Sequence, residues 1–342
     1  MSVLSLGWEV PPAVLSSAAI EERLGPVYER LGLLPGRLEL MTGIRERRYW
    51  PEQPAPSEVA IRAGRMALER AGLDPKDVGC LIHASVCRDF LEPATASVVH
   101  HALGLGRECM FFDLSNACLG VVNAMLLVDR LIAGGSIEHG LIVAGENGLP
   151  LVESTIRALL ADPSLTRRSI KGAFSSLTIG SGAAAVLLSR EGEGPRLIGG
   201  VMRAGTEHNG LCRGGALGHA DAGVGADSVL EMRTDAEALL AAGLELAAAT
   251  WREFVAATGF ADPDRTITHQ VGKAHTRALY ERLGLPIERG HLSYEWLGNV
   301  GSVSLPLTLA LAADAGFVAR GHRVALLGIG SGLSSAMLGV EW

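Results

Sequence analysis

The stretch of sequence that decides the fold is Asp113-Leu-Ser-Asn-Ala-Cys118-Leu-Gly-Val-Val-Asn-Ala-Met-Leu-Leu-Val128. The apolar run Met110-Phe-Phe precedes it, small residues surround Cys118, and apolar residues then fill every face of a possible helix. This pattern predicts a strand, a tight turn and a buried helix that begins at a thiol. Unpaired N–H groups and the positive end of the dipole at a helix N-terminus favour a thiolate. Cys118 is therefore a candidate nucleophile, although a buried cysteine is equally common as a small core residue.

Length and composition indicate a globular protein. The chain has 342 residues, of which 48% are hydrophobic and 20% charged, enough for one large or two medium domains. A net charge of −7 argues against a general nucleic-acid binder, which needs a basic face. The segment Met1–Val10 lacks the basic start of a signal peptide, and no apolar run reaches the roughly 18 residues of a membrane span without a charge or a glycine. We therefore expect no integral membrane segment.

The cysteines indicate a reducing compartment. They are odd in number, widely spaced and mostly within apolar stretches, and they form no CxxC pair. We therefore expect neither a disulfide framework nor a metal site, and we expect a cytoplasmic protein. The five residues are Cys80, Cys87, Cys109, Cys118 and Cys212.

Strands and helices are predicted to alternate along the first half. Helical spacing runs from Ser16 to Leu31 and again from Ser57 to Ala71, where Ser57 is the expected N-cap. The unbroken apolar runs Val78–Val86 and His139–Gly145 are typical of buried strands. This alternation predicts an α/β protein with a parallel or mixed sheet covered by helices.

An internal repeat divides the chain. Ile179-Gly-Ser-Gly and Ile329-Gly-Ser-Gly lie 150 residues apart, and each leads into an apolar strand. A duplicated α/β unit explains this spacing, and chance recurrence in a glycine-rich chain is the alternative. In the second half, His269 lies near the end of the predicted strand Thr266–Val271. Asn299 lies in a glycine-rich turn before an apolar helix, much as Cys118 does in the first half.

Three separated stretches together resemble one family. Ala117-Cys118-Leu-Gly, His269-Gln270 and Gly298-Asn299-Val-Gly-Ser-Val-Ser-Leu-Pro306 are similar to the Cys, His and Asn motifs of the ketoacyl synthase III enzymes in the thiolase superfamily. Thr42-Gly-Ile-Arg-Glu-Arg-Arg48 and Gly328-Ile-Gly-Ser-Gly332 match the same group. The resemblance implies a thiolase fold, a duplicated five-layered αβαβα arrangement with two mixed sheets. It also implies an N-terminal half, residues 1–190, that carries the nucleophile, and a C-terminal half, residues 191–342, that carries His and Asn.

Within that family, the stretch Ser85–Ser97 resembles the OleA enzymes, which join two fatty acyl-CoA molecules head to head. The chain departs from the chain-initiating synthases where those enzymes hold the CoA nucleotide, because the corresponding positions here are Arg37 and Met41. Their arginine five residues after the catalytic histidine is replaced by Ala274. Contacts with CoA or a carrier protein therefore cannot be transferred from them.

The resemblance implies roles for the site residues. Cys118 would take an acyl group from a first thioester, and the backbone N–H groups of Cys118 and Ser331 would form an oxyanion hole, worth roughly 3 to 4 kcal/mol per donor. Family enzymes usually have glycine at the position of Ser331, but the backbone donor survives the change. His269 and Asn299 would donate hydrogen bonds to the enolate of the second thioester.

Joining two acyl chains that carry no α-carboxylate requires a base. A malonyl unit forms its carbanion by losing CO2, whereas here an α-proton must be removed. The OleA resemblance implies that Glu92 is this base and that its loop crosses the interface of a homodimer into the neighbouring site. An ordinary solvated glutamate before Pro93 is the alternative.

The implied reaction is a Claisen condensation of two long-chain acyl-CoA thioesters to a β-keto acid without decarboxylation. The alternatives are a ketoacyl synthase III that uses malonyl carrier protein, a ketosynthase that links two polyketide chains, and an inactive scaffold. The implied partners are acyl-CoA or an acyl carrier protein, a second copy of the chain and downstream enzymes. CoA enters as part of the substrate, and no other cofactor is expected.

Overall fold

The computed structural model describes residues 1–216 and 230–342. Nine of its strands form one mixed sheet in the order β11-β12-β13-β8-β1-β7-β6-β4-β5. Strands β1 and β8 share a single residue pair, Ser2 with Arg196, so the two expected mixed sheets lie on either side of this narrow link. The strands are β1 (Ser2–Glu9), β4 (Cys80–His83), β5 (Met110–Asp113), β6 (His139–Glu146), β7 (Gly182–Ser189), β8 (Arg196–Ala204), β11 (Arg265–Thr268), β12 (Arg323–Gly330) and β13 (Ser334–Glu341).

The internal repeat of the sequence corresponds to a repeat in strand pairing. Strand β7 is antiparallel to both β6 and β1, and β13 is antiparallel to both β12 and β8. Beyond them, β4 runs parallel to β6 and β11 runs parallel to β12. The two Ile-Gly-Ser-Gly turns thus lead into strands with the same neighbours in each half. The division at residues 190 and 191 stays a prediction.

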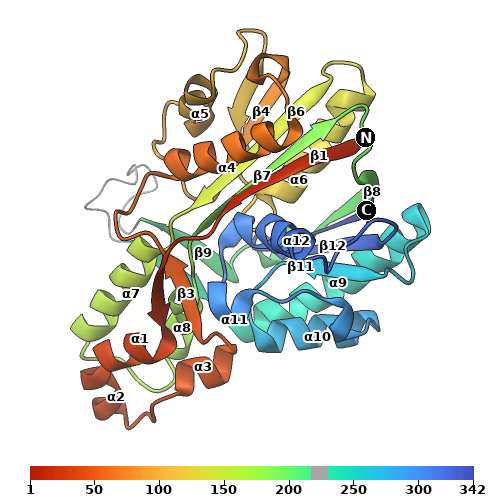
Figure 1. Ribbon diagram of the computed structural model, residues 1–342. Coiled ribbons are helices and arrows are strands. Elements are labelled where there is room, and N and C mark those ends of the chain that lie inside the picture. The colour runs from red at the N-terminus through yellow and green to blue at the C-terminus, as the bar shows by residue number, and fades with distance from the viewer. Residues whose placement is uncertain (217–229) are drawn as a thin grey trace.

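Helices complete the five layers. Helix α6 (Gly120–Ala133) contacts β6, β7 and β13, and α12 (Ser304–Asp314) contacts β7, β1 and β11, so both lie between the two parts of the sheet. Helices α4 (Pro56–Ala71) and α5 (Thr95–Leu103) cover one outer face, and α9 (Ala236–Thr258) with α10 (Lys273–Leu283) covers the other (Figure 1). Helix α12 is buried over most of its surface, whereas α6 keeps Asp129 and Arg130 near its exposed C-terminal end.

Of the remaining elements, α1, α2, α3, α7, α8 and β3 gather at one end of the molecule, whereas β9 and α11 lie nearer its middle (Figure 1). Helix α7 packs with α1 and α2 in a separate apolar cluster that includes Ile20, Leu24 and Ile156. No helix among the described residues is long and apolar enough to cross a bilayer. The elements are β2 (Ala13–Ser16), α1 (Ser17–Arg23), α2 (Gly25–Leu31), α3 (Arg37–Thr42), β3 (Glu46–Tyr49), α7 (Leu149–Ala161), α8 (Lys171–Leu177), β9 (Cys212–Ala216), β10 (Leu230–Thr234) and α11 (Tyr294–Leu297).

Three local predictions need correction. The helix expected over residues 16–31 is two helices, α1 and α2, that meet at Leu24. Ser57 is not the N-cap of α4, because the helix begins at Pro56 and the Ser57 N–H donates to the Asp89 carboxylate at 2.9 Å. The strand expected over residues 78–86 is limited to Cys80–His83, since the chain then turns into the loop that carries Glu92.

Close packing of α4 on β1 gives a stability prediction. An added Cβ at Gly7 would lie 2.0 Å from the Ala63 carbonyl oxygen, which belongs to the helix backbone. Gly7→Ala should therefore lower the free energy of unfolding by about 1 to 3 kcal/mol in urea denaturation. Gly25→Ala is the matched control, because nothing lies within 4 Å of its added Cβ and it should be neutral or slightly stabilising. Equal stability of the two variants would contradict the prediction.

Candidate active site

Cys118 lies in a strained turn between β5 and α6, as the sequence predicted in outline. Ala117 adopts φ +46°, a left-handed conformation that costs a non-glycine residue roughly 1 to 2 kcal/mol. Gly120 begins α6, and an added Cβ there would lie 2.5 Å from the Ala84 carbonyl oxygen. The first residue of α6 is thus packed against the backbone of Ala84, which lies just before the loop that carries Glu92. Strain at this position is consistent with a functional turn.

The same turn meets the end of β12, about two hundred residues further along the chain. The Leu119 side chain fills the space above two glycines of β12, since an added Cβ at Gly328 would lie 2.5 Å and one at Gly330 2.9 Å from Leu119 side-chain carbons. The backbone N–H groups of Cys118 and Ser331 both act on the Cys118 thiol and lower its pKa. The family resemblance implies these two groups as the donors of the oxyanion hole, a role that stays a prediction.

The charge state of the thiol depends on opposing influences. Burial raises the pKa of Cys118 to about 12, and the negative charge of Glu146 acts in the same direction. The two backbone N–H groups lower this pKa but do not outweigh burial. Cys118 also precedes the N-cap Leu119, so the thiolate that the helix start is expected to favour stays a prediction.

His269 follows β11 and is held beside β12. Its backbone N–H donates to the Leu327 carbonyl at 3.0 Å, and the side chain is buried. Burial lowers the pKa of His269 to about 3, and nearby His275 of α10 lowers it further. The imidazole is therefore neutral near pH 7 and can donate one N–H, as a role at a developing oxyanion requires.

Asn299 lies in a turn that leads through a short 3-10 segment, Gly301–Val303, into α12. Its Oδ1 accepts from the Gly301 N–H at 3.1 Å and from the Ser304 hydroxyl at 3.5 Å. Its backbone pairs with Thr178 and Gly180. Because Oδ1 is used inside the turn and Nδ2 has no partner among the described residues, the side chain presents an N–H donor.

Glu92 is not brought to these residues within one chain. It lies on an exposed loop, and its carboxylate has no hydrogen bond or ion pair to any described residue. The base of the loop is nevertheless fixed, since the Asp89 N–H donates to Thr95 Oγ1 at 3.1 Å. Asp113 accepts the N–H groups of Thr95 and Ala96 at 2.9 and 2.8 Å.

Sequence reasoning missed two buried polar residues near the site. Glu146 ends β6 and acts on the Cys118 thiol, and His83 contacts the Ser85 hydroxyl at 3.0 Å behind the same loop. The sequence did contain a pattern that could have identified Glu146, because this charged residue comes directly after an unbroken apolar run. His83 lies inside an apolar run, and its sequence context does not distinguish it from an ordinary histidine of the hydrophobic core.

Buried histidines predict a fall in stability at acid pH. Burial lowers the pKa of His83 to about 4, of His269 to about 3 and of His275 to about 4, whereas an unfolded histidine titrates near 6.5. The three buried histidines therefore leave the folded state at its full stability above pH 6.5. As the pH falls from 6.5 toward 4, the free energy of unfolding decreases, because only the unfolded chain binds protons at these histidines. At pH 5 the loss should reach about 2 kcal/mol per histidine, measured by urea denaturation. His275→Gln should reduce this slope, and a constant free energy from pH 7.5 to 5 would contradict the prediction.

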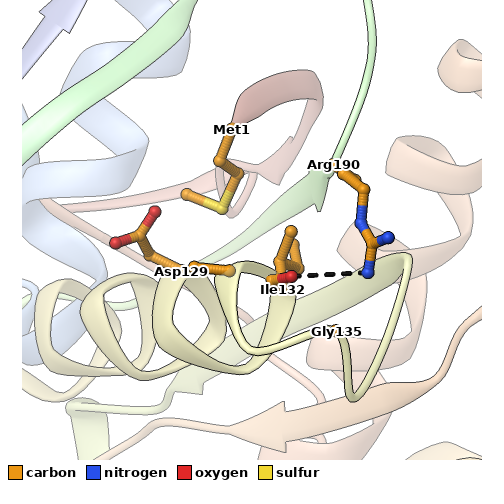
Figure 2. A pocket seen from close by; sticks show the side chains of 6 residues that line it. Met1, Asp129, Ile132, Gly135 and Arg190 are labelled. Atoms are coloured by element: carbon orange, nitrogen blue, oxygen red, sulfur yellow. Dashed lines mark hydrogen bonds between the residues drawn. The ribbon is translucent and has the colours of Figure 1, made fainter.

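A shallow hollow of about 300 Å³ lies elsewhere, beside the end of α6 (Figure 2). None of the predicted site residues lines it, so it has no part in this site. Its lining consists of Met1, Asp129, Ile132, Ala133, Gly135 and Arg190.

A thiol at the start of α6, a neutral imidazole beside β12 and an amide donor before α12 are the groups that an enzyme needs to transfer acyl groups and condense them. Two family models match, 3-oxoacyl-[acyl-carrier-protein (ACP)] synthase III over residues 112–205 and its C-terminal part over residues 256–342. The chain belongs to this ketoacyl synthase III family of the thiolase superfamily, and within it to the OleA-like condensing enzymes.

Specific relatives are similar over the whole chain. It is 39% identical to the acyl-CoA:acyl-CoA alkyltransferase of Shewanella oneidensis, over 99% of this chain and 97% of the relative. It is 36% identical to the protein of the same name from Xanthomonas campestris, over 100% and 98%. A crystal structure of a cysteine-to-serine variant of Xanthomonas campestris OleA with bound lauric acid and lauroyl-CoA superposes with a TM-score of 0.91, at 36% identity and over 100% and 98% of the two chains.

Proposed function

We propose that this protein joins two long-chain acyl-CoA thioesters by a Claisen condensation that needs no decarboxylation. The observation that carries the proposal is the whole-length likeness to two acyl-CoA:acyl-CoA alkyltransferases, at 39% and 36% identity. The lauroyl-CoA in the related crystal structure supports acyl-CoA as the substrate class. Delivery by an acyl carrier protein is the alternative that the assay below separates.

In the first half-reaction the Cys118 sulfur attacks the thioester carbonyl and the CoA thiolate leaves. The N–H groups of Cys118 and Ser331 stabilise the oxyanion of the tetrahedral intermediate. His269 assists removal of the thiol proton, which is needed because burial raises the pKa of Cys118 to about 12. The product is an acyl group bound to Cys118 and free CoA.

In the second half-reaction a base removes an α-proton from the second acyl-CoA. The enolate oxygen accepts hydrogen bonds from the neutral His269 and the Asn299 amide. The α-carbon then attacks the acyl group on Cys118, the C–S bond breaks, and a β-ketoacyl-CoA leaves. Hydrolysis of its thioester gives the β-keto acid.

The base in this scheme is Glu92 from the second subunit of a homodimer. Apolar side chains surround its loop at the surface, with Phe90 52% and Leu91 72% exposed. Met110 and Phe111 are also exposed on β5, the edge strand of the sheet. An exposed apolar edge of this kind supports coverage by a second copy, which would bring Glu92 to the partner site.

The cytoplasm is the proposed compartment. All five cysteines are free in the structure, which agrees with a reducing environment. No cofactor other than the CoA of the substrates takes part in the proposed steps.

Purified protein incubated with lauroyl-CoA alone tests the proposal. We expect release of free CoA and formation of a β-keto acid or its ketone by mass spectrometry, at a rate that malonyl-CoA or malonyl carrier protein does not raise. Product that appears only with a malonyl thioester would instead establish the decarboxylating synthase. Acylation of Cys118 without any product in either arm would indicate an acyl-binding scaffold.

A further inference from the structure

Glu146, at the end of β6, is the most heavily hydrogen-bonded carboxylate near the site. It is only 4% exposed. One oxygen accepts the Val86 N–H at 2.8 Å, the Ser302 N–H at 3.3 Å and the Ser302 hydroxyl at 2.7 Å. The other oxygen accepts the Cys87 N–H at 3.0 Å. Every one of these groups donates, so the carboxylate acts as an acceptor in all four hydrogen bonds.

These four hydrogen bonds join two segments that carry proposed catalytic groups. Val86 and Cys87 begin the loop that leads to Glu92, and Ser302 lies three residues after Asn299. Gly301 allows the close approach, since an added Cβ there would lie 3.1 Å from Glu146 Oε1. One carboxylate therefore fixes the base of the Glu92 loop and the turn of Asn299 to the same strand end.

The same carboxylate acts on nearby thiols. Cys87 is the thiol that faces Glu146 directly, and its pKa is raised by burial and then by the carboxylate. The pKa of Cys118 is raised by burial first, then by the charge of Glu146 and less strongly by Cys212 of β9.

We propose that Glu146 is a positioning residue that holds the Asn299 turn and the Glu92 loop in place for the condensation step. This inference rests on the proposed function, because the two segments that Glu146 fixes carry the amide donor and the base of that reaction.

Glu146→Gln tests this role. Glutamine keeps the size of the side chain, but its amide nitrogen donates and cannot accept the N–H groups that the carboxylate accepts. Condensation of lauroyl-CoA should therefore fall about tenfold, while acylation of Cys118, followed by intact-protein mass spectrometry, stays as in the wild type. Glu21→Gln is the matched control, because Glu21 is also a buried carboxylate that accepts backbone N–H groups, from Gly36 and Leu38, but it lies on α1. It should acylate and condense as the wild type does.

Ser302→Ala tests the same role from the side of the Asn299 turn. It removes the 2.7 Å hydrogen bond from the Ser302 hydroxyl to Glu146, so condensation of lauroyl-CoA should fall about tenfold while the acylation of Cys118 stays as in the wild type. Wild-type condensation in Ser302→Ala and Glu146→Gln, or an equal loss of acylation and condensation, would overturn the positioning role. If the wild type itself acylates Cys118 but makes no β-keto product, the proposed function fails instead.

Discussion

A Glu92→Ala variant is expected to acylate Cys118 at the wild-type rate and to lose condensation by about 10²- to 10⁴-fold, the range that a general base contributes. Acylation needs no carbanion, so it does not depend on this carboxylate. The substitution should leave the fold intact, because Glu92 lies at the exposed part of a loop whose base is held by Asp89, Asp113 and Glu146. The measurement is the time course of CoA release together with the yield of β-keto product. In Glu92→Ala we expect a single burst of CoA and no β-keto product.

Mixed dimers locate the subunit that supplies Glu92. Neither Cys118→Ala nor Glu92→Ala should condense substrate alone. Co-expressed with two affinity tags, they form a dimer in which one site combines an intact Cys118 with the partner's intact Glu92. Random assembly makes about half of the dimers mixed, each with one complete site of two, so about a quarter of the wild-type activity should return. No recovery in purified mixed dimers would place Glu92 in its own site or outside the mechanism.

Local sequence patterns were sufficient for the elements that the mechanism uses. The strand, turn and helix around Cys118 follow from an apolar run, small residues and a second apolar run, each a signal within about twenty residues. The repeated Ile-Gly-Ser-Gly turns predicted two strands with matching neighbours, β7 and β13. The turn that carries Asn299 was also predicted from a local pattern, a glycine-rich stretch followed by the apolar run that forms α12.

The predictions that failed depended on groups far apart in sequence. The Ser57 N–H is capped by Asp89, 32 residues away, which no local capping rule identifies. Burial and the charge of Glu146 both raise the pKa of the Cys118 thiol, and the local sequence around Cys118 indicates neither effect. The role of Glu92 stays a prediction, since its proposed site of action lies on another chain. Sequence reasoning found the chemical groups, but their electrostatic environment required the fold.

A Cys118→Ala variant is expected to carry no acyl group after incubation with lauroyl-CoA and to lose condensation by at least about 10⁴-fold, because both half-reactions pass through the thioester at this residue. The intact-protein mass should rise by one lauroyl group in the wild type and stay constant in the variant. Cys80→Ala is the matched control, since burial also raises the pKa of Cys80 to about 12 but the thiol lies inside β4, in the core. It should acylate and condense as the wild type does. A lauroyl adduct that persists in Cys118→Ala, or one that disappears in Cys80→Ala, would show that a different thiol is the nucleophile.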